Sequence, residues 1–125
     1  MSKKYIEFAL KTESRDMTPV KERIGTDSSV RLLHAGLGLG TEVAEIQDAL
    51  KKHYFYGKPL DKVNLAEEMG DVFWYLAILA DELGVSFEET MDKNIAKLKK
   101  RYGEKFTNDK AINRNVAEER KILES

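Results

Sequence analysis

Two pairs of acidic residues carry the clearest chemical signal in this chain. The first pair is Glu42 and Glu45, the second is Glu68 and Asp71, and each stands in an apolar run with helical spacing. Residues three positions apart share one face of a helix, so each pair should project two carboxylates in one direction. Immediately after Asp71, residues 72–80 contain no charge at all. Buried carboxylates are costly unless a cation meets them, and these pairs therefore predict a cation site.

The chemistry of such a site follows from its ligands. If the two acidic helices face each other, four carboxylates converge, and two like charges about 4 Å apart repel by roughly 4 kcal/mol at an effective dielectric near 20. All-oxygen ligation favours a hard cation, Mg²⁺ or alternatively Mn²⁺, ahead of zinc or copper. Magnesium works beside substrate phosphates and lowers the pKa of an attacking water. We therefore expect phosphate-ester or phosphoanhydride chemistry, with Glu42, Glu45, Glu68 and Asp71 as metal ligands.

Other interpretations of these acids are weaker. A di-iron bundle would need Glu-x-x-His motifs, but the residues three positions before His34 and His53 are Arg31 and Leu50. One Glu-x-x-Glu pair alone is usually a solvated helix face, whereas two pairs on consecutive helices with core-type neighbours favour a site. We interpret the neighbouring acids, Glu67 and Asp48, as surface residues, with an outer-shell role as the alternative for Asp48.

Anionic substrates also need cations. Asn94, Lys97 and Arg101 are spaced by three and four positions and should form one polar stripe, suited to phosphate contacts. Lys58, in the turn between the acidic helices, should reach the same site. The alternative for the stripe is a solvated basic face. The glycines at 36, 38 and 40 do not fit a phosphate-binding loop, and close helix packing or a helix break explains them better.

The elements that position these residues are predicted to be helices. Apolar spacing is helical nearly throughout, with turns at Gly57–Pro59 and caps at Asp61 and Ser86. We expect an all-α bundle of four to five helices. Their predicted ranges are 5–12, 27–54, 61–84, 86–103 and 108–123.

Length and composition set further limits. With 125 residues, we expect one domain covering 1–125. A net charge of −1 gives no general attraction to nucleic acid, and the longest uncharged apolar run is about half a membrane span. The chain has no cysteine, which excludes disulfides and thiol nucleophiles. These features predict a cytoplasmic protein with neither nucleic acid nor membrane as partner.

The third predicted helix indicates self-association. Residues 72–80 are apolar around the whole helix circumference, more than one chain of this size can cover. We expect a homodimer or homotetramer, with Phe73, Trp74 and Tyr75 as candidate interface residues, since aromatic residues are enriched at interfaces. The alternative is that these three aromatics fill the core of a single chain.

At these motifs the chain resembles the MazG-like family of all-α nucleoside triphosphate pyrophosphohydrolases. The resemblance covers most of the chain, and the 22 residues between Glu45 and Glu68 are typical of its twin acidic motif. It is carried by five segments: 36–45, 55–60, 68–71, 94–102 and 111–114. The chain departs from the family pattern at Asn115, where an acid often follows, so a role of this C-terminal segment in the site is not supported.

The resemblance implies Mg²⁺-dependent hydrolysis of a (deoxy)nucleoside triphosphate to the monophosphate and pyrophosphate. A metal-activated water would attack the α-phosphorus, with Glu42 or Glu45 as base. It also implies that the four acids bind the metal, that Asn94, Lys97 and Arg101 contact metal and phosphates, and that subunits form dimers or tetramers. Two alternatives stay open: a non-catalytic helical oligomer whose acids form internal ion pairs, and a related all-α enzyme acting on deoxyuridine triphosphate or a nucleoside diphosphate.

Overall fold

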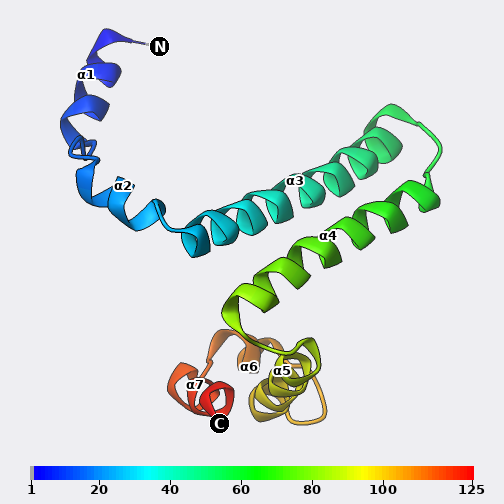
Figure 1. Cartoon of the computed structure of the whole chain (residues 1–125). Helices are drawn as coiled ribbons and strands as arrows, with labels where there is room; N and C mark the ends of the chain where they lie inside the picture. Colours follow the sequence, from blue (N-terminus) through cyan, green and yellow to red (C-terminus); the bar gives the residue numbers. More distant parts are fainter. Residues whose placement is uncertain (1) are drawn as a thin grey trace.

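The computed structural model describes residues 2–125, and all regular structure in this range is helical (Figure 1). The expected all-α class is confirmed. Seven helices follow one another: α1 (Lys3–Thr12), α2 (Thr18–Ile24), α3 (Asp27–Tyr56), α4 (Lys62–Leu83), α5 (Phe87–Tyr102), α6 (Asn108–Ile112) and α7 (Val116–Glu124).

The helix boundaries follow local capping chemistry. The Asp61 carboxylate accepts hydrogen bonds of 3.0 Å from the backbone N–H groups of Val63 and Asn64 and so begins α4. Gly57 and Gly84 end α3 and α4 with φ values of 69° and 64°, a left-handed conformation that glycine adopts without strain. The predicted bounds of the two acidic helices are therefore confirmed to within two residues.

Seven helices rather than four to five result from two local features. Pro19 stands in the first turn of α2, where its missing N–H costs no hydrogen bond, so it begins a helix instead of only ending one. Near the C-terminus, the predicted range 108–123 is divided because the chain leaves helical geometry at Asn113 and Asn115 caps α7. The Asn115 side chain accepts a 3.2 Å hydrogen bond from the backbone N–H of Glu118.

The acidic helices α3 and α4 pack against each other as a long antiparallel pair (Figure 1). Gly38 allows this packing, because a Cβ atom there would lie 2.1 Å from the Tyr75 ring. The expectation of close packing is thus confirmed at Gly38, while the alternative of a helix break is wrong, since α3 is continuous. Gly70 has no such neighbour within 4 Å in the described chain.

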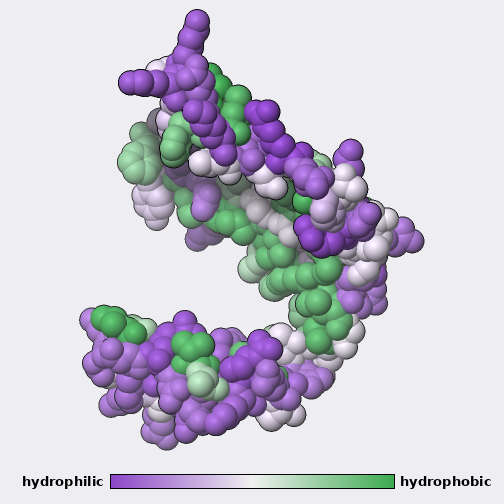
Figure 2. Space-filling view, turned by 90° about the vertical axis from the view of Figure 1, so that its left-hand side faces the viewer, coloured by the Kyte–Doolittle hydropathy of each residue, from purple (hydrophilic) through white to green (hydrophobic). Residues whose placement is uncertain are grey.

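Helices α5, α6 and α7 form a second packed group beyond the end of α4, and within residues 2–125 α5 makes at most marginal contact with α3 and α4. The four to five helices therefore do not close into one bundle within a single chain. Viewed from the side, the molecule is C-shaped, and hydrophobic side chains gather on the inner side of the C (Figure 2).

Much apolar surface remains uncovered. The accessible surface is 10358 Å², whereas a compact monomer of 14.3 kDa should expose about 6,800 Å². Of the aromatics in the apolar stretch of α4, Phe73 and Trp74 are more than half exposed, while Tyr75 is partly buried against Gly38. No helix within residues 2–125 combines the length and hydrophobicity needed to cross a membrane.

Candidate metal and substrate site

Carboxylates from α3 and α4 meet midway along the helix pair. Glu42, Glu68 and Asp71 each offer a carboxylate oxygen within 4.8 Å of the other two. Each acidic pair shares a helix face because of its three-residue spacing, and antiparallel packing places the two faces opposite each other. The arrangement joins residues 26 or more positions apart in the sequence, as the twin motif predicted.

Glu45 belongs to the same group electrostatically. The negative charge of Glu68 raises the pKa of the Glu45 carboxyl, with further contributions from burial and from Glu42. All four predicted acids are therefore gathered in one place, with Glu45 on the side toward the turn between α3 and α4.

None of the four acids takes part in an ion pair within residues 2–125. The nearest influence of a cation is on Glu45: the pKa of Lys52 is raised by its hydrogen bond to Asp48 and, to a lesser degree, by the charge of Glu45.

Glu68 is only 5% exposed, and its carboxylate accepts a 2.7 Å hydrogen bond from the Asn64 side-chain amide. Of the other three acids, Glu42 is partly buried, whereas Glu45 and Asp71 are exposed in the single chain. Negative charges gathered around a buried carboxylate without a cation are costly. The donor set consists of carboxylate oxygens, and it fits a hard divalent cation.

Asn64 is a residue that motif reasoning missed. It could have been found from its position in the sequence, four residues before Glu68 and therefore on the same face of α4. By donating to Glu68 it fixes the orientation of that carboxylate, as hydrogen bonds around metal ligands commonly do.

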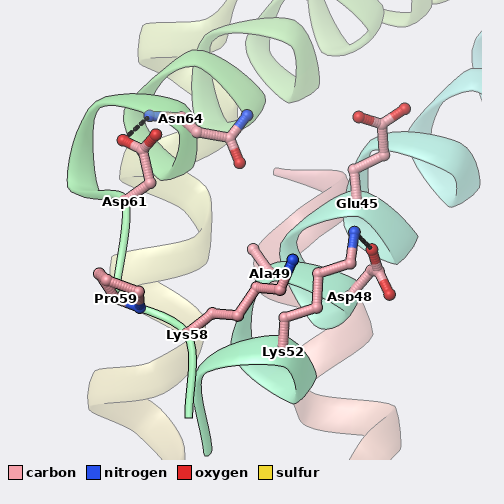
Figure 3. A pocket seen from close by; sticks show the side chains of 8 residues that line it. All are labelled: Glu45, Asp48, Ala49, Lys52, Lys58, Pro59, Asp61 and Asn64. Carbon is pink, nitrogen blue, oxygen red and sulfur yellow. Dashed lines mark hydrogen bonds and ion pairs between the residues drawn. The ribbon is translucent and has the colours of Figure 1, made fainter. Parts of the chain in front are cut away.

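A cavity of about 530 Å³ adjoins the acidic cluster (Figure 3). It lies between the last turns of α3, the connecting turn and the start of α4, and its size is in the range of small-molecule sites. Glu45 and Asn64 stand on its wall toward the cluster, and Lys58 lines it from the turn. The structure thus brings Lys58 beside the predicted acids.

The three predicted residues of α5 are not brought to the acids within one chain, because α5 packs with α6 and α7 instead. Asn94 is exposed and Lys97 partly buried there. Arg101 is occupied: its guanidinium donates hydrogen bonds of 2.7 and 2.6 Å to Glu119 of α7. Arg114 donates a third, of 2.8 Å, to the same carboxylate.

This ion-pair cluster is the second buried acidic group of the described chain. Hydrogen bonds from Arg101 and then Arg114 lower the pKa of Glu119 to about 2. Arg101 was predicted to bind phosphate, and Glu119 was not among the predicted site residues. The available signal was a helical register in α7 that places one acid on its apolar side, toward α5.

Comparison with known proteins identifies one family. The uncharacterized protein YvdC of Bacillus subtilis (strain 168) is 54% identical over 41 residues, which are 33% of this chain and 39% of that protein. The alignment thus spans well under half of either chain. No solved structure matches. The MazG nucleotide pyrophosphohydrolase domain matches residues 33–106, which include both acidic pairs and Lys58. Since this match covers more than half of the chain, the protein belongs to the MazG family.

Proposed function

We propose that the protein hydrolyses (deoxy)nucleoside triphosphates to the monophosphate and pyrophosphate. The water oxygen forms a bond to the α-phosphorus, the bond from this phosphorus to the α,β-bridging oxygen breaks, and pyrophosphate leaves with the electron pair. The observation that carries the proposal is the convergence of four carboxylates, none of which forms an ion pair within residues 2–125, in a chain of the MazG family.

We assign metal binding and proton acceptance to the acidic side chains of α3 and α4. Glu42, Glu45, Glu68 and Asp71 would hold Mg²⁺, or alternatively Mn²⁺, and Asn64 orients Glu68. A divalent cation bound there would neutralise phosphate charge and acidify a bound water. Glu45 lies outside the closest group of three acids and lines the cavity, so we assign its carboxylate to accept the proton of the attacking water. Glu42 is the alternative base.

Lys58 would bind the substrate phosphates from the turn. Asn94, Lys97 and Arg101 would need a second copy of the chain to reach an acidic cluster, because their own helix is turned to α7. The uncovered surface beyond that of a compact monomer is about 3,500 Å² per chain, or about 7,000 Å² for two chains, which is at least as much as large obligate homodimer interfaces bury in total. We therefore propose a homodimer or homotetramer of a single domain covering 1–125, whose packing covers exposed side chains such as Trp74.

The non-catalytic alternative required the four acids to pair with Lys97, Arg101 or other bases of the protein. Within residues 2–125 no such pair forms, and Arg101 pairs with Glu119 instead. Ion pairs within one chain therefore do not account for the four acids.

Product analysis tests the proposal. Canonical and modified nucleoside triphosphates are incubated with the protein with and without Mg²⁺, and monophosphate and pyrophosphate are measured. Glu45→Gln should lower turnover by about a hundredfold or more. Glu67→Gln, which removes an exposed acid on the same helix as Glu68, should retain the wild-type rate. Near-normal activity of Glu45→Gln, or no turnover of any triphosphate, would contradict the proposal.

A further inference from the structure

The cavity beside the acidic cluster is lined by both acidic and basic side chains. Glu45 lines it on the side of the cluster, and two lysines line it as well: Lys52, two helical turns after Glu45 on α3 and paired with Asp48, and Lys58 from the turn (Figure 3). A polyphosphate bound to a cation at the acids would leave its remaining negative charge for these two lysines. The spatial order of acids followed by ammonium groups suits such a ligand.

The acids on the lysine side are already occupied. The Asp61 carboxylate accepts hydrogen bonds from two backbone N–H groups at the start of α4. Asp48 is shared by two lysines, with its oxygens 2.5 Å from Lys52 Nζ and 3.2 Å from Lys51 Nζ. Lys52 thus shares the Asp48 carboxylate with Lys51 and is also influenced by the charge of Glu45, while Lys58 forms no ion pair within residues 2–125.

Lys51 and Lys52 differ in direction although they share the partner. Both are about half exposed, and an exposed pair one helical turn apart contributes little to stability. Of Lys51 and Lys52, only Lys52 lines the cavity. The hydrogen bond to Asp48 raises the pKa of Lys52, so its ammonium group stays charged at neutral pH. Asp48 therefore fixes the Lys52 ammonium group at the cavity wall, where it stays accessible to a ligand.

We propose that Lys52 binds the terminal phosphates of the triphosphate, with Asp48 as its positioning residue. The proposal rests on the proposed function, since it assigns the cavity to the part of the substrate that leaves as pyrophosphate. It gives this end of α3 a role in substrate binding that neither acidic motif contains.

Lys52→Gln and Lys51→Gln form a matched pair for the test, because each removes one ammonium group from Asp48. Lys52→Gln should raise the KM for the triphosphate and the Kd for inorganic tripolyphosphate with Mg²⁺ by about tenfold, the scale of one charge-assisted hydrogen bond. Lys51→Gln should change both less than about twofold. Lys52→Arg should retain most of the wild-type affinity, and Mg²⁺ binding alone should be the same in all three variants.

The outcomes separate this proposal from the proposed function. If Lys52→Gln and Lys51→Gln show equal KM and Kd values, Lys52 serves only the helix and the proposal is wrong, while hydrolysis by the wild type would leave the proposed function standing. If the wild type hydrolyses no triphosphate but binds tripolyphosphate through Lys52, the proposed function fails and the phosphate site remains. Absence of any tripolyphosphate binding by the wild type would overturn the role of Lys52 as well.

Discussion

The two acidic regions of the molecule differ in how their negative charge is balanced. Between α5 and α7, Glu119 receives three hydrogen bonds from Arg101 and Arg114, and its pKa falls to about 2. Between α3 and α4, the acids form no ion pair within residues 2–125, and the charge of Glu68 raises the pKa of Glu45. An acid neutralised by its own protein holds the fold together. Acids left to repel one another indicate a cation from outside.

Substitution of Glu119 should give the largest effect on stability. Glu119→Gln leaves the Arg101 guanidinium, 11% exposed, without its anionic partner. Breaking a buried pair from one side is strongly destabilising, and the melting temperature should fall by about 10 °C. The matched control is Glu118→Gln, which removes only an exposed pair with Lys121 and should cost no more than about 2 °C. Equal losses in the two variants would mean that the α5–α7 cluster is not a structural anchor.

The pH dependence of this loss follows from the pKa of Glu119. Because its folded-state pKa of about 2 lies below the ordinary 4.5, the unfolded chain binds more protons between these values, and stability rises with pH there. The contribution of Glu119 is complete above pH 4.5 and disappears as the pH falls toward 2. Thermal unfolding of wild type and Glu119→Gln should therefore converge over this window. A constant difference would contradict the assigned ionisation.

Addition of Mg²⁺ should also distinguish the two regions, with a change in melting temperature smaller than the loss caused by Glu119→Gln. A cation that binds only the folded state raises stability according to its concentration relative to Kd, and millimolar Mg²⁺ should raise the melting temperature by about 5 °C. Glu68→Gln removes a carboxylate of the cluster and should abolish this shift. Glu119→Gln should keep it despite its lower starting value. An equal shift in Glu68→Gln would place Mg²⁺ binding elsewhere.

The same contrast explains how much could be predicted from the sequence. The acidic cluster was predictable because it depends on helical spacing within α3 and α4 and on a short turn that makes them antiparallel. The caps at Asp61 and Ser86 are local signals and were also predicted. Close packing at Gly38 was expected, but its partner, Tyr75, was placed among the interface candidates.

Arg101 shows where such reasoning ends. A guanidinium on a polar stripe is suited to a phosphate or a carboxylate equally well, and only the path of the chain after Gly103 brings Glu119 to it. That path depends on a break at residues 113–115, where the sequence predicted a continuous helix. Lys52 was missed for a related reason. It belongs to no motif, and the cavity that it lines forms only where the connecting turn and the start of α4 lie beside the end of α3.

The smallest effect is expected for Glu45→Gln measured without divalent cations. The charge of Glu68 raises the Glu45 pKa, which means that ionised Glu45 is disfavoured in the folded state relative to the unfolded chain. Replacing this carboxylate by a neutral amide relieves repulsion with Glu68, so the melting temperature in chelator at neutral pH should stay equal or rise by about 2 °C. Thermal unfolding in chelator with and without the substitution measures this change. The same substitution should then lower the gain from Mg²⁺, so one side chain opposes apo stability and supports cation binding. A marked loss of melting temperature in chelator would instead give Glu45 a hydrogen-bonded structural role like that of Glu119.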